Sequence, residues 1–295
     1  MKGNHGGFSI LYVLYGLFLF CLLLLIFFPY GRLAESLIHR FSEERKITMR
    51  YDHFDFHLPL RCSFQPVEIL LPNGDGQIPI YRGNLLSLRV SPWSLFRGRV
   101  RADFQGKGYG GTLSGSVRIR RPFSSGAGKY FLQVAQLRIE DVLSPFYLRD
   151  FKIDGRLSGE GTIRVPEEGR YLKATGKITA SLKNGSVRNI LIQGLDLPDF
   201  NFQAIEVKTD LREGVLRIRK CHVASDILLA EIDGEVRLDA RDIRESPLNL
   251  TAHLKAQADD PINLKGVARF FHKTPDSKGY YSFRIQGTFR NPQLL

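Results

Sequence analysis

The sequence predicts an all-β protein: an elongated, strongly curved and mostly antiparallel sheet, forming an open groove or a partial barrel, behind an N-terminal transmembrane helix. Three observations predict this. From Leu228 to Arg241, apolar or small residues alternate with charged ones, and side chains on a strand point to opposite faces with a period of two. An apolar run from Phe8 to Phe28 precedes the body. Beyond residue 46, helical periodicity is scarce.

Residues 1–31 are interpreted as a short tail and a membrane anchor. The run from Phe8 to Phe28 carries no charge, and at about 1.5 Å per residue it spans a bilayer core of roughly 30 Å. A cleaved signal peptide is the alternative, but its apolar region is about 7–15 residues long and ends in a small-x-small site, which we do not find. The positions expected in the membrane are Phe8, Leu14, Leu17, Leu22, Ile26 and Phe28.

Residues 32–46 are expected to form an amphipathic juxtamembrane helix. Its apolar stripe consists of Leu33, Leu37, Ile38 and Phe41. A helix lying on the bilayer surface and an ordinary packed helix both fit this stripe. Basic residues are more frequent after the anchor than before it, which by the positive-inside rule favours a cytoplasmic body, but long domains translocate largely regardless of charge. Charge alone therefore leaves the orientation open.

Residues 47–295 are expected to form the β-rich body. Alternating segments recur, separated by turn signals such as Pro72–Gly76. Only the stretches Gly194–Pro198 and Val142–Tyr147 look irregular or helical. Glycines recur inside or beside the strands, where they permit bulges and sharp curvature. The absence of alternating strands and helices argues against a parallel α/β sheet.

The dry faces of the C-terminal strands are the candidate binding surface. Few amphipathic helices are available to cover them, so the sheet closes on itself, pairs with a second sheet or holds something apolar. The candidate groove residues are Leu228, Ala230, Ile232, Val236, Leu238, Leu250, Leu254, Phe283 and Ile285.

The motifs that usually carry chemistry fail their context tests. Gly106–Gly111 contains G-x-G-x-x-G, but a strand follows instead of a helix, so a hairpin turn is expected. His53 and His57 are four apart in strand-like sequence, where about 3.3 Å per residue places them about 13 Å apart, too far to bind one metal ion. Adjacent carboxylates lack a partnering nucleophile. We therefore expect no enzyme activity, no cofactor and no metal site.

Charge and cysteines add two open questions. The net charge is +12, and a basic stripe of Arg97, Arg99, Arg101, Arg118 and Arg120 could face anions or be the wet side of a sheet. Cys62 and Cys221 could pair in an oxidising compartment or remain separate buried thiols.

Several segments resemble the N component of the bacterial type II secretion system. They are Phe28–Leu33, Leu85–Gly98, Gly110–Gly115, Ser246–Leu250 and Phe283–Pro292. The likeness extends more distantly to the AsmA and TamB group, whose curved β-groove is associated with lipid transport.

The resemblance implies a single-pass protein of the bacterial inner membrane, with a cytoplasmic N-terminus and a periplasmic body. The expected function is that of a non-catalytic component of type II protein secretion. The alternative is an AsmA-like lipid-binding or lipid-transport protein. Expected partners are inner-membrane lipids, other secretion subunits and phospholipid in the groove, and no nucleic acid.

Overall fold

The computed structural model describes only part of the chain. The described residues are 15–16, 19–20, 23, 31–32, 35–36, 39–40, 47–57, 60–73, 76–119, 127–144, 152–166, 173–192, 195–197, 199–239, 242, 245–257, 268–269 and 271–295. The chain divides into two compact units, Met1–Ile47 and Thr48–Leu295.

In the first unit, the described residues between positions 15 and 40 are helical. Tyr15 and Phe20 expose 62% and 60% of their surface. Among the described residues, no helix is both long enough and apolar enough to cross a membrane. The predicted anchor and stripe positions lie outside the described residues: Phe8, Leu14, Leu17, Leu22, Ile26 and Phe28, and Leu33, Leu37, Ile38 and Phe41.

The second unit consists almost entirely of strands. Its elements in chain order are β1 (Thr48–His57), β2 (Arg61–Asn73), β3 (Gly76–Val90), α3 (Pro92–Phe96), β4 (Val100–Gly108), β5 (Gly111–Ile119), β6 (Gly128–Arg138), α4 (Ile139–Leu143), β7 (Lys152–Ile153), β8 (Arg156–Val165), β9 (Thr175–Arg188), β10 (Ile190–Ile192), β11 (Leu195–Leu197), β12 (Phe200–Arg212), β13 (Val215–Ser225), β14 (Leu228–Arg237), β15 (Pro247–Ala256), β16 (Tyr281–Thr288) and β17 (Pro292–Leu294).

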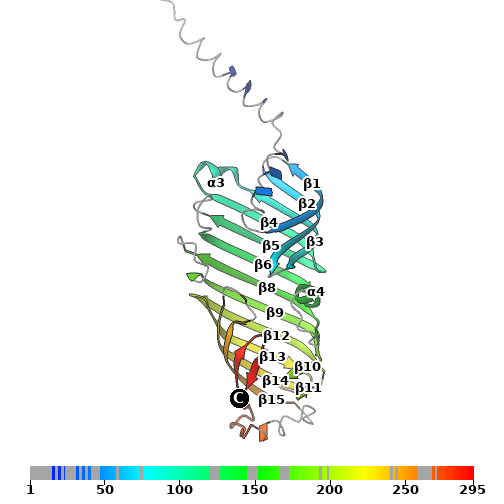
Figure 1. Cartoon of the computed structure of the whole chain (residues 1–295), viewed down its shortest axis with the longest axis vertical. Coiled ribbons are helices and arrows are strands. Elements are labelled where there is room, and N and C mark those ends of the chain that lie inside the picture. The colour runs from blue at the N-terminus through cyan, green and yellow to red at the C-terminus, as the bar shows by residue number, and fades with distance from the viewer. Residues whose placement is uncertain are drawn as a thin grey trace, which may run out of the picture. The chain divides into compact units, whose positions relative to one another are not determined.

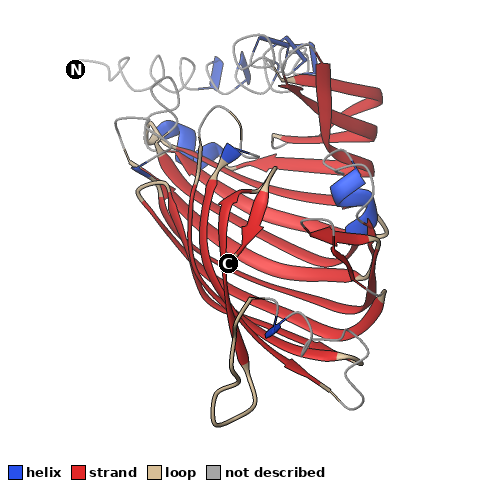
Figure 2. Cartoon of the chain, turned by 60° about the horizontal axis from the view of Figure 1, so that its bottom comes forward, coloured by secondary structure: helices blue, strands red, loops and turns tan. Residues whose placement is uncertain are grey.

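These strands form one long antiparallel sheet of 15 strands. The order is β1-β2-β3-β4-β5-β6-β8-β9-β12-β13-β14-β15-β16-β17, with β7 paired to β9 and a separate β10–β11 hairpin. Figure 1 shows the strands stacked one above another, with α3 and α4 at opposite strand-end edges. In Figure 2 they form one continuous layer. The predicted all-β, antiparallel class is confirmed.

The sheet is neither closed nor strongly curled, so the predicted strong curvature and partial barrel are wrong. Part of the reason is the role of the glycines. A Cβ at Gly115 would overlap the ring of Phe104, and one at Gly185 would overlap the ring of Phe202. These glycines make room for aromatic rings to lie across the neighbouring strand, instead of bending the sheet.

The glycine-rich segment between β4 and β5 is the expected hairpin. Gly108 and Gly111 are opposite each other, and the turn between them is Tyr109 and Gly110, with φ of 52° and 71°. Positive φ at both central residues is the geometry that matches the twist of a two-residue hairpin.

Two other local expectations need correction. Leu195–Leu197, expected to be irregular or helical, forms β11 and pairs with β10. Residues after Val90 turn into the short helix α3, which begins at Pro92, a residue suited to the first helical position. In contrast, the interruption expected near Val142 is present in the structure as the helix α4.

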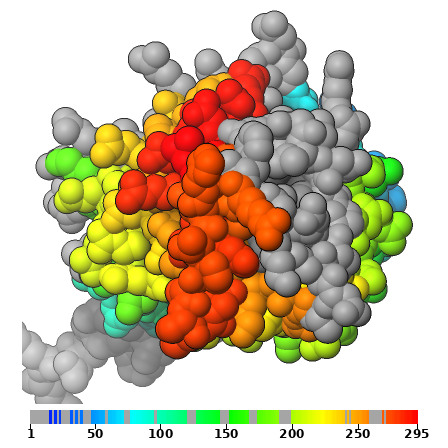
Figure 3. All heavy atoms as spheres, turned by 90° about the horizontal axis from the view of Figure 1, so that it is seen from below, coloured from blue at the N-terminus to red at the C-terminus, as the bar shows by residue number. Residues whose placement is uncertain are grey.

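Buried side chains gather at the margins of the sheet. On one strand-end edge, Ile139 of α4 packs with Leu182, Val187 and Phe202. On the other, Val165, Ala174 and Leu211 cluster. At the C-terminal end, Ala268 and Phe283 are buried beneath partly buried neighbours that include Phe271 and Leu294. Figure 3 shows the orange and red C-terminal residues spread over this end.

Candidate functional site

Strand register aligns apolar residues across the whole sheet. Residues directly opposite each other in an antiparallel pair share a face. Following the partners from β1 to β16 gives one continuous row: Phe54, Phe64, Leu86, Gly106, Leu113, Val134, Gly159, Ala180, Val207, Cys221, Ile232, Ala252 and Phe283.

Three further rows run beside the first on the same face. The second is Phe56, Cys62, Leu88, Phe104, Gly115, Leu132, Gly161, Ile178, Thr209, Ile218, Gly234, Leu250, Ile285 and Leu294. The third is Val90, Ala102, Val117, Tyr130, Ile163, Gly176, Leu211, Leu216, Val236, Leu248, Gly287 and Pro292. The fourth is Leu137, Leu157, Leu182, Ile205, Val223, Ala230, Leu254 and Tyr281.

We call the surface made by these four rows the apolar face. Thr209 is its one residue that is neither apolar, glycine, cysteine nor tyrosine. The opposite side, the polar face, carries the alternate positions, among them Lys177 opposite Asp210 and Arg217 opposite Glu235. The sheet is therefore amphipathic from its first strand to its last.

Exposure of the apolar face changes along the sheet. At the C-terminal end it is covered: Val236, Ala252 and Phe283 are 1%, 2% and 1% exposed. On β5–β9 the first three rows are only partly buried, and Leu132 is 43% exposed, whereas Leu137 and Leu182 of the fourth row are buried. Among the described residues, the one other sheet is the β10–β11 hairpin, and its strand β10 lies against β17. The open part of the apolar face is therefore its middle.

The predicted groove residues come together on this face. Ala230, Ile232, Val236, Leu250, Leu254, Phe283 and Ile285 belong to its rows, and Leu228 pairs with Ala256 beside them. Leu238 follows β14 and packs on the edge cluster around Val165. These residues lie mostly at the covered end. Sequence reasoning missed the open part, because glycines interrupt the apolar alternation on β5 and β8.

The basic stripe is only partly as predicted. Arg101 and Arg118 lie directly opposite each other on β4 and β5. Arg97 is in the turn that follows α3, so the expectation that it shares a strand face is wrong, and Arg99 precedes the first residue of β4. Arg120 lies outside the described residues. The turn after Pro92 removes Arg97 from the strand.

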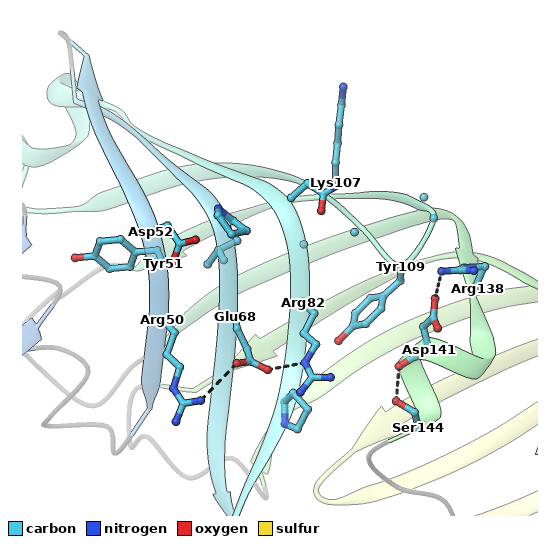
Figure 4. Close-up of a pocket in the computed structure, with 18 residues that line it drawn as sticks. Arg50, Tyr51, Asp52, Glu68, Arg82, Lys107, Tyr109, Arg138, Asp141 and Ser144 are labelled. Carbon is cyan, nitrogen blue, oxygen red and sulfur yellow. Dashed lines mark hydrogen bonds and ion pairs between the residues drawn. The ribbon is translucent and has the colours of Figure 1, made fainter.

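A pocket of about 820 Å³ lies where β1–β3 meet the β4–β5 turn and α4 (Figure 4). Several of its charges are paired: Glu68 lies 3.8 Å from Arg50 and 2.5 Å from Arg82, and Arg138 lies 2.7 Å from Asp141. These pairs form a structural ion-pair network in the wall of the pocket.

Burial shapes the chemistry of the remaining candidates. Cys62 and Cys221 are separate free thiols, and burial raises the pKa of both, which lowers their thiolate fraction and reactivity. His53 and His57 are exposed on β1. Among the described residues, no cluster of three or more histidine, cysteine, aspartate and glutamate residues is arranged to hold a metal.

The chain matches no protein-family model, no curated protein and no solved structure. Its function is therefore inferred from the apolar face itself. That face offers van der Waals contact over many strands and almost no hydrogen-bonding groups, so it is suited to a long apolar ligand and unsuited to a polar substrate.

Proposed function

We propose that this protein is a non-catalytic, membrane-anchored lipid-binding protein, and that the apolar face is the floor of an open groove for acyl chains. The observation that carries the proposal is the continuity of the four apolar rows across the sheet, together with the partial exposure of the first three rows on β5–β9. Soluble proteins rarely leave contiguous apolar patches larger than a few hundred Å² open to water, and larger ones mark interaction sites.

The dimensions favour a chain-like ligand. With about 4.8 Å between neighbouring strands, the 14 strands of the path extend over roughly 60 Å. Four rows spaced by two residues cover roughly 20 Å along the strands. An acyl chain occupies one leaflet, about half of a hydrocarbon core of roughly 30 Å. The apolar face is therefore wide enough for an acyl chain in either direction.

The energetics favour the same ligand. Removing an acyl chain from a bilayer into water costs about 0.8 kcal/mol per methylene. Contact with a continuous apolar face recovers that transfer free energy at any position of the acyl chain, so binding at one strand is as favourable as binding at the next. Side-chain clusters at both strand-end edges give this floor its rims, with Ile139 on one side and Val165 on the other.

Site-specific photo-crosslinking in cells tests this proposal. A benzophenone amino acid at Leu132 sits on the open part of the apolar face, and one at Gln133 is the matched control on the polar face of the same strand. We expect phosphate-labelled lipid to crosslink at position 132 and not at position 133. The proposal is refuted if lipid is absent at both positions or equal at both.

A second candidate function, a component of type II secretion in the inner membrane with a periplasmic body, is favoured by the resemblance of Leu85–Gly98 and Phe283–Pro292. The proposed partners are then other secretion subunits. Affinity purification of the full chain from membranes distinguishes the two: secretion subunits co-purify in this case, whereas bound phospholipid without them supports lipid binding alone.

A further inference from the structure

Four basic residues stand side by side at one strand-end edge of the sheet. Arg101, Arg118, Lys129 and Arg164 are each directly opposite the next on β4, β5, β6 and β8. Each is one residue inside the end of its strand, and all four are exposed on the polar face. We call them the basic edge.

Like charges in this arrangement cost stability, because directly opposed residues of an antiparallel pair have Cβ atoms about 5 Å apart. Elsewhere on the polar face, some opposed residues carry opposite charges, such as Arg217 and Glu235, and others carry like charges, such as Lys208 and Lys220. The basic edge differs because its like charges continue through three successive strand pairs.

Within the described part of the chain, little offsets this charge. Among the ion pairs of the described residues, the basic edge has one, between Arg101 and Asp103 at 4.0 Å. The opposite strand-end edge also carries neighbouring basic residues, Arg138 and Arg156, but there Arg138 is paired with Asp141. The basic edge is thus the surface best prepared to receive an external anion.

A tryptophan marks the same edge. Trp93 of α3 is 74% exposed, and α3 leads directly into β4. Hydrogen bonds fix the helix there: the Arg99 amide donates to the Ser94 carbonyl at 2.9 Å, and the Arg101 amide donates to Ser94 Oγ at 3.0 Å. Exposed tryptophan flanked by basic side chains is typical of surfaces at the bilayer–water interface, where the indole lies among the headgroups.

We propose that the basic edge and Trp93 dock the second unit on the surface of an anionic phospholipid bilayer. The guanidinium and ammonium groups lie against lipid phosphates, and the indole enters the headgroup layer. This docking is independent of acyl-chain binding, because the basic edge is on the polar face and the acyl floor is on the apolar face. Crosslinking at Leu132 and docking of the edge can therefore fail separately.

The single tryptophan of the chain gives a direct assay. The full chain is reconstituted into vesicles of phosphatidylcholine alone, or of phosphatidylcholine with phosphatidylglycerol, each with brominated acyl chains as quenchers. In anionic vesicles we expect Trp93 emission to be blue-shifted and quenched. In neutral vesicles we expect the emission maximum of Trp93 to stay at the long wavelength of a solvent-exposed indole, without quenching. Raising the salt to about 0.5 M, where screening acts within a few ångströms, releases Trp93 from the anionic vesicles.

Substitution separates the basic edge from overall charge. In R101Q/R118Q/K129Q/R164Q, the ratio of docked to undocked protein falls about fivefold for each residue replaced, several hundredfold in total at low salt. The matched control, K107Q/K183Q/K208Q/K220Q, removes the same charge from exposed positions elsewhere on the sheet and keeps its docking.

Three results overturn the proposal. The first is a Trp93 that stays unquenched in anionic vesicles. The second is an equal loss of docking in the control variant, which assigns the attraction to net charge. The third is release of Trp93 from the brominated anionic vesicles by a short oligonucleotide, as effectively as by an excess of added anionic vesicles. That result assigns the basic edge to polyanions in general. The salt titration needs no variant, so the test holds even if the quadruple variant misfolds.

Discussion

If the middle of the apolar face is open, truncating a large side chain there should lower the free energy of unfolding far less than truncating one at the covered end. Leu132 is 43% exposed and its cross-strand neighbours on that face are glycines, Gly115 and Gly161. Full burial of a leucine side chain stabilises a protein by about 1.5–3 kcal/mol. A side chain that is roughly half buried therefore contributes about half of that, about 1 kcal/mol. Leu132→Ala should lower the free energy of unfolding by about that amount.

Phe283→Ala is the comparison. Phe283 is 1% exposed, and its ring meets that of Phe271 edge to face at a centroid distance of 6.1 Å. Truncating a buried phenylalanine costs about 3–5 kcal/mol through lost transfer free energy and the cavity left behind, and the aromatic pair adds about 1 kcal/mol. The loss of stability in Phe283→Ala is therefore expected to be about four to six times that in Leu132→Ala.

Urea unfolding of the full chain, followed by circular dichroism in one detergent, measures both costs. Adding phospholipid is the decisive second arm, because a ligand that binds only the folded state raises its stability. Lipid should stabilise the unsubstituted protein more than Leu132→Ala, and so widen the difference between them. If Leu132→Ala costs as much as Phe283→Ala without lipid, another layer covers β5–β9 and the open-face reasoning is wrong.

Three further outcomes follow from single side chains. Thr209→Val should raise the free energy of unfolding by about 1 kcal/mol in thermal unfolding, since the Thr209 hydroxyl is buried and, within the described residues, has no hydrogen-bond partner; a loss of stability would reveal a partner. Burial raises the pKa of Tyr81 to about 12, so the folded protein keeps a proton that the unfolded chain loses near pH 10, and stability should fall between pH 10 and pH 12. Tyr81→Phe should flatten that slope, and an unchanged slope would assign it to other groups. Cys62 and Cys221 should both react slowly with iodoacetamide at neutral pH and fully after unfolding without reductant; a disulfide-linked peptide in the mass spectrum would contradict separate thiols.

Much of the strand content is visible in the sequence because each strand carries its own alternation. The segment from Leu228 onward predicts β14 within a few residues, and the turn at Tyr109 and Gly110 follows from the surrounding glycines. These features are local: they depend on side-chain period and on permitted φ values, which neighbouring residues determine.

The site was harder to predict because it depends on register. That Leu132 lies between Gly115 and Gly161 follows from two strand pairings, and one of them also contains a register shift between Val134 and Leu137. One-residue shifts of this kind decide which side chains share a face. Lys129 and Arg164 of the basic edge were not predicted, because their place beside Arg118 also depends on strand register.

The order of the strands has a consequence for how the chain reaches its native state. Apart from the short excursions at β7 and β10–β11, each strand pairs with the strands immediately before and after it in the chain, so few contacts await a distant segment. Such local topology permits rapid assembly. During synthesis from the N-terminus, each new strand can pair with the strand before it as soon as it is complete, so each step exposes one new strand edge. The path of the sheet ends at β1 and at β17, and β17 is three residues long, which makes that edge a poor template for aggregation.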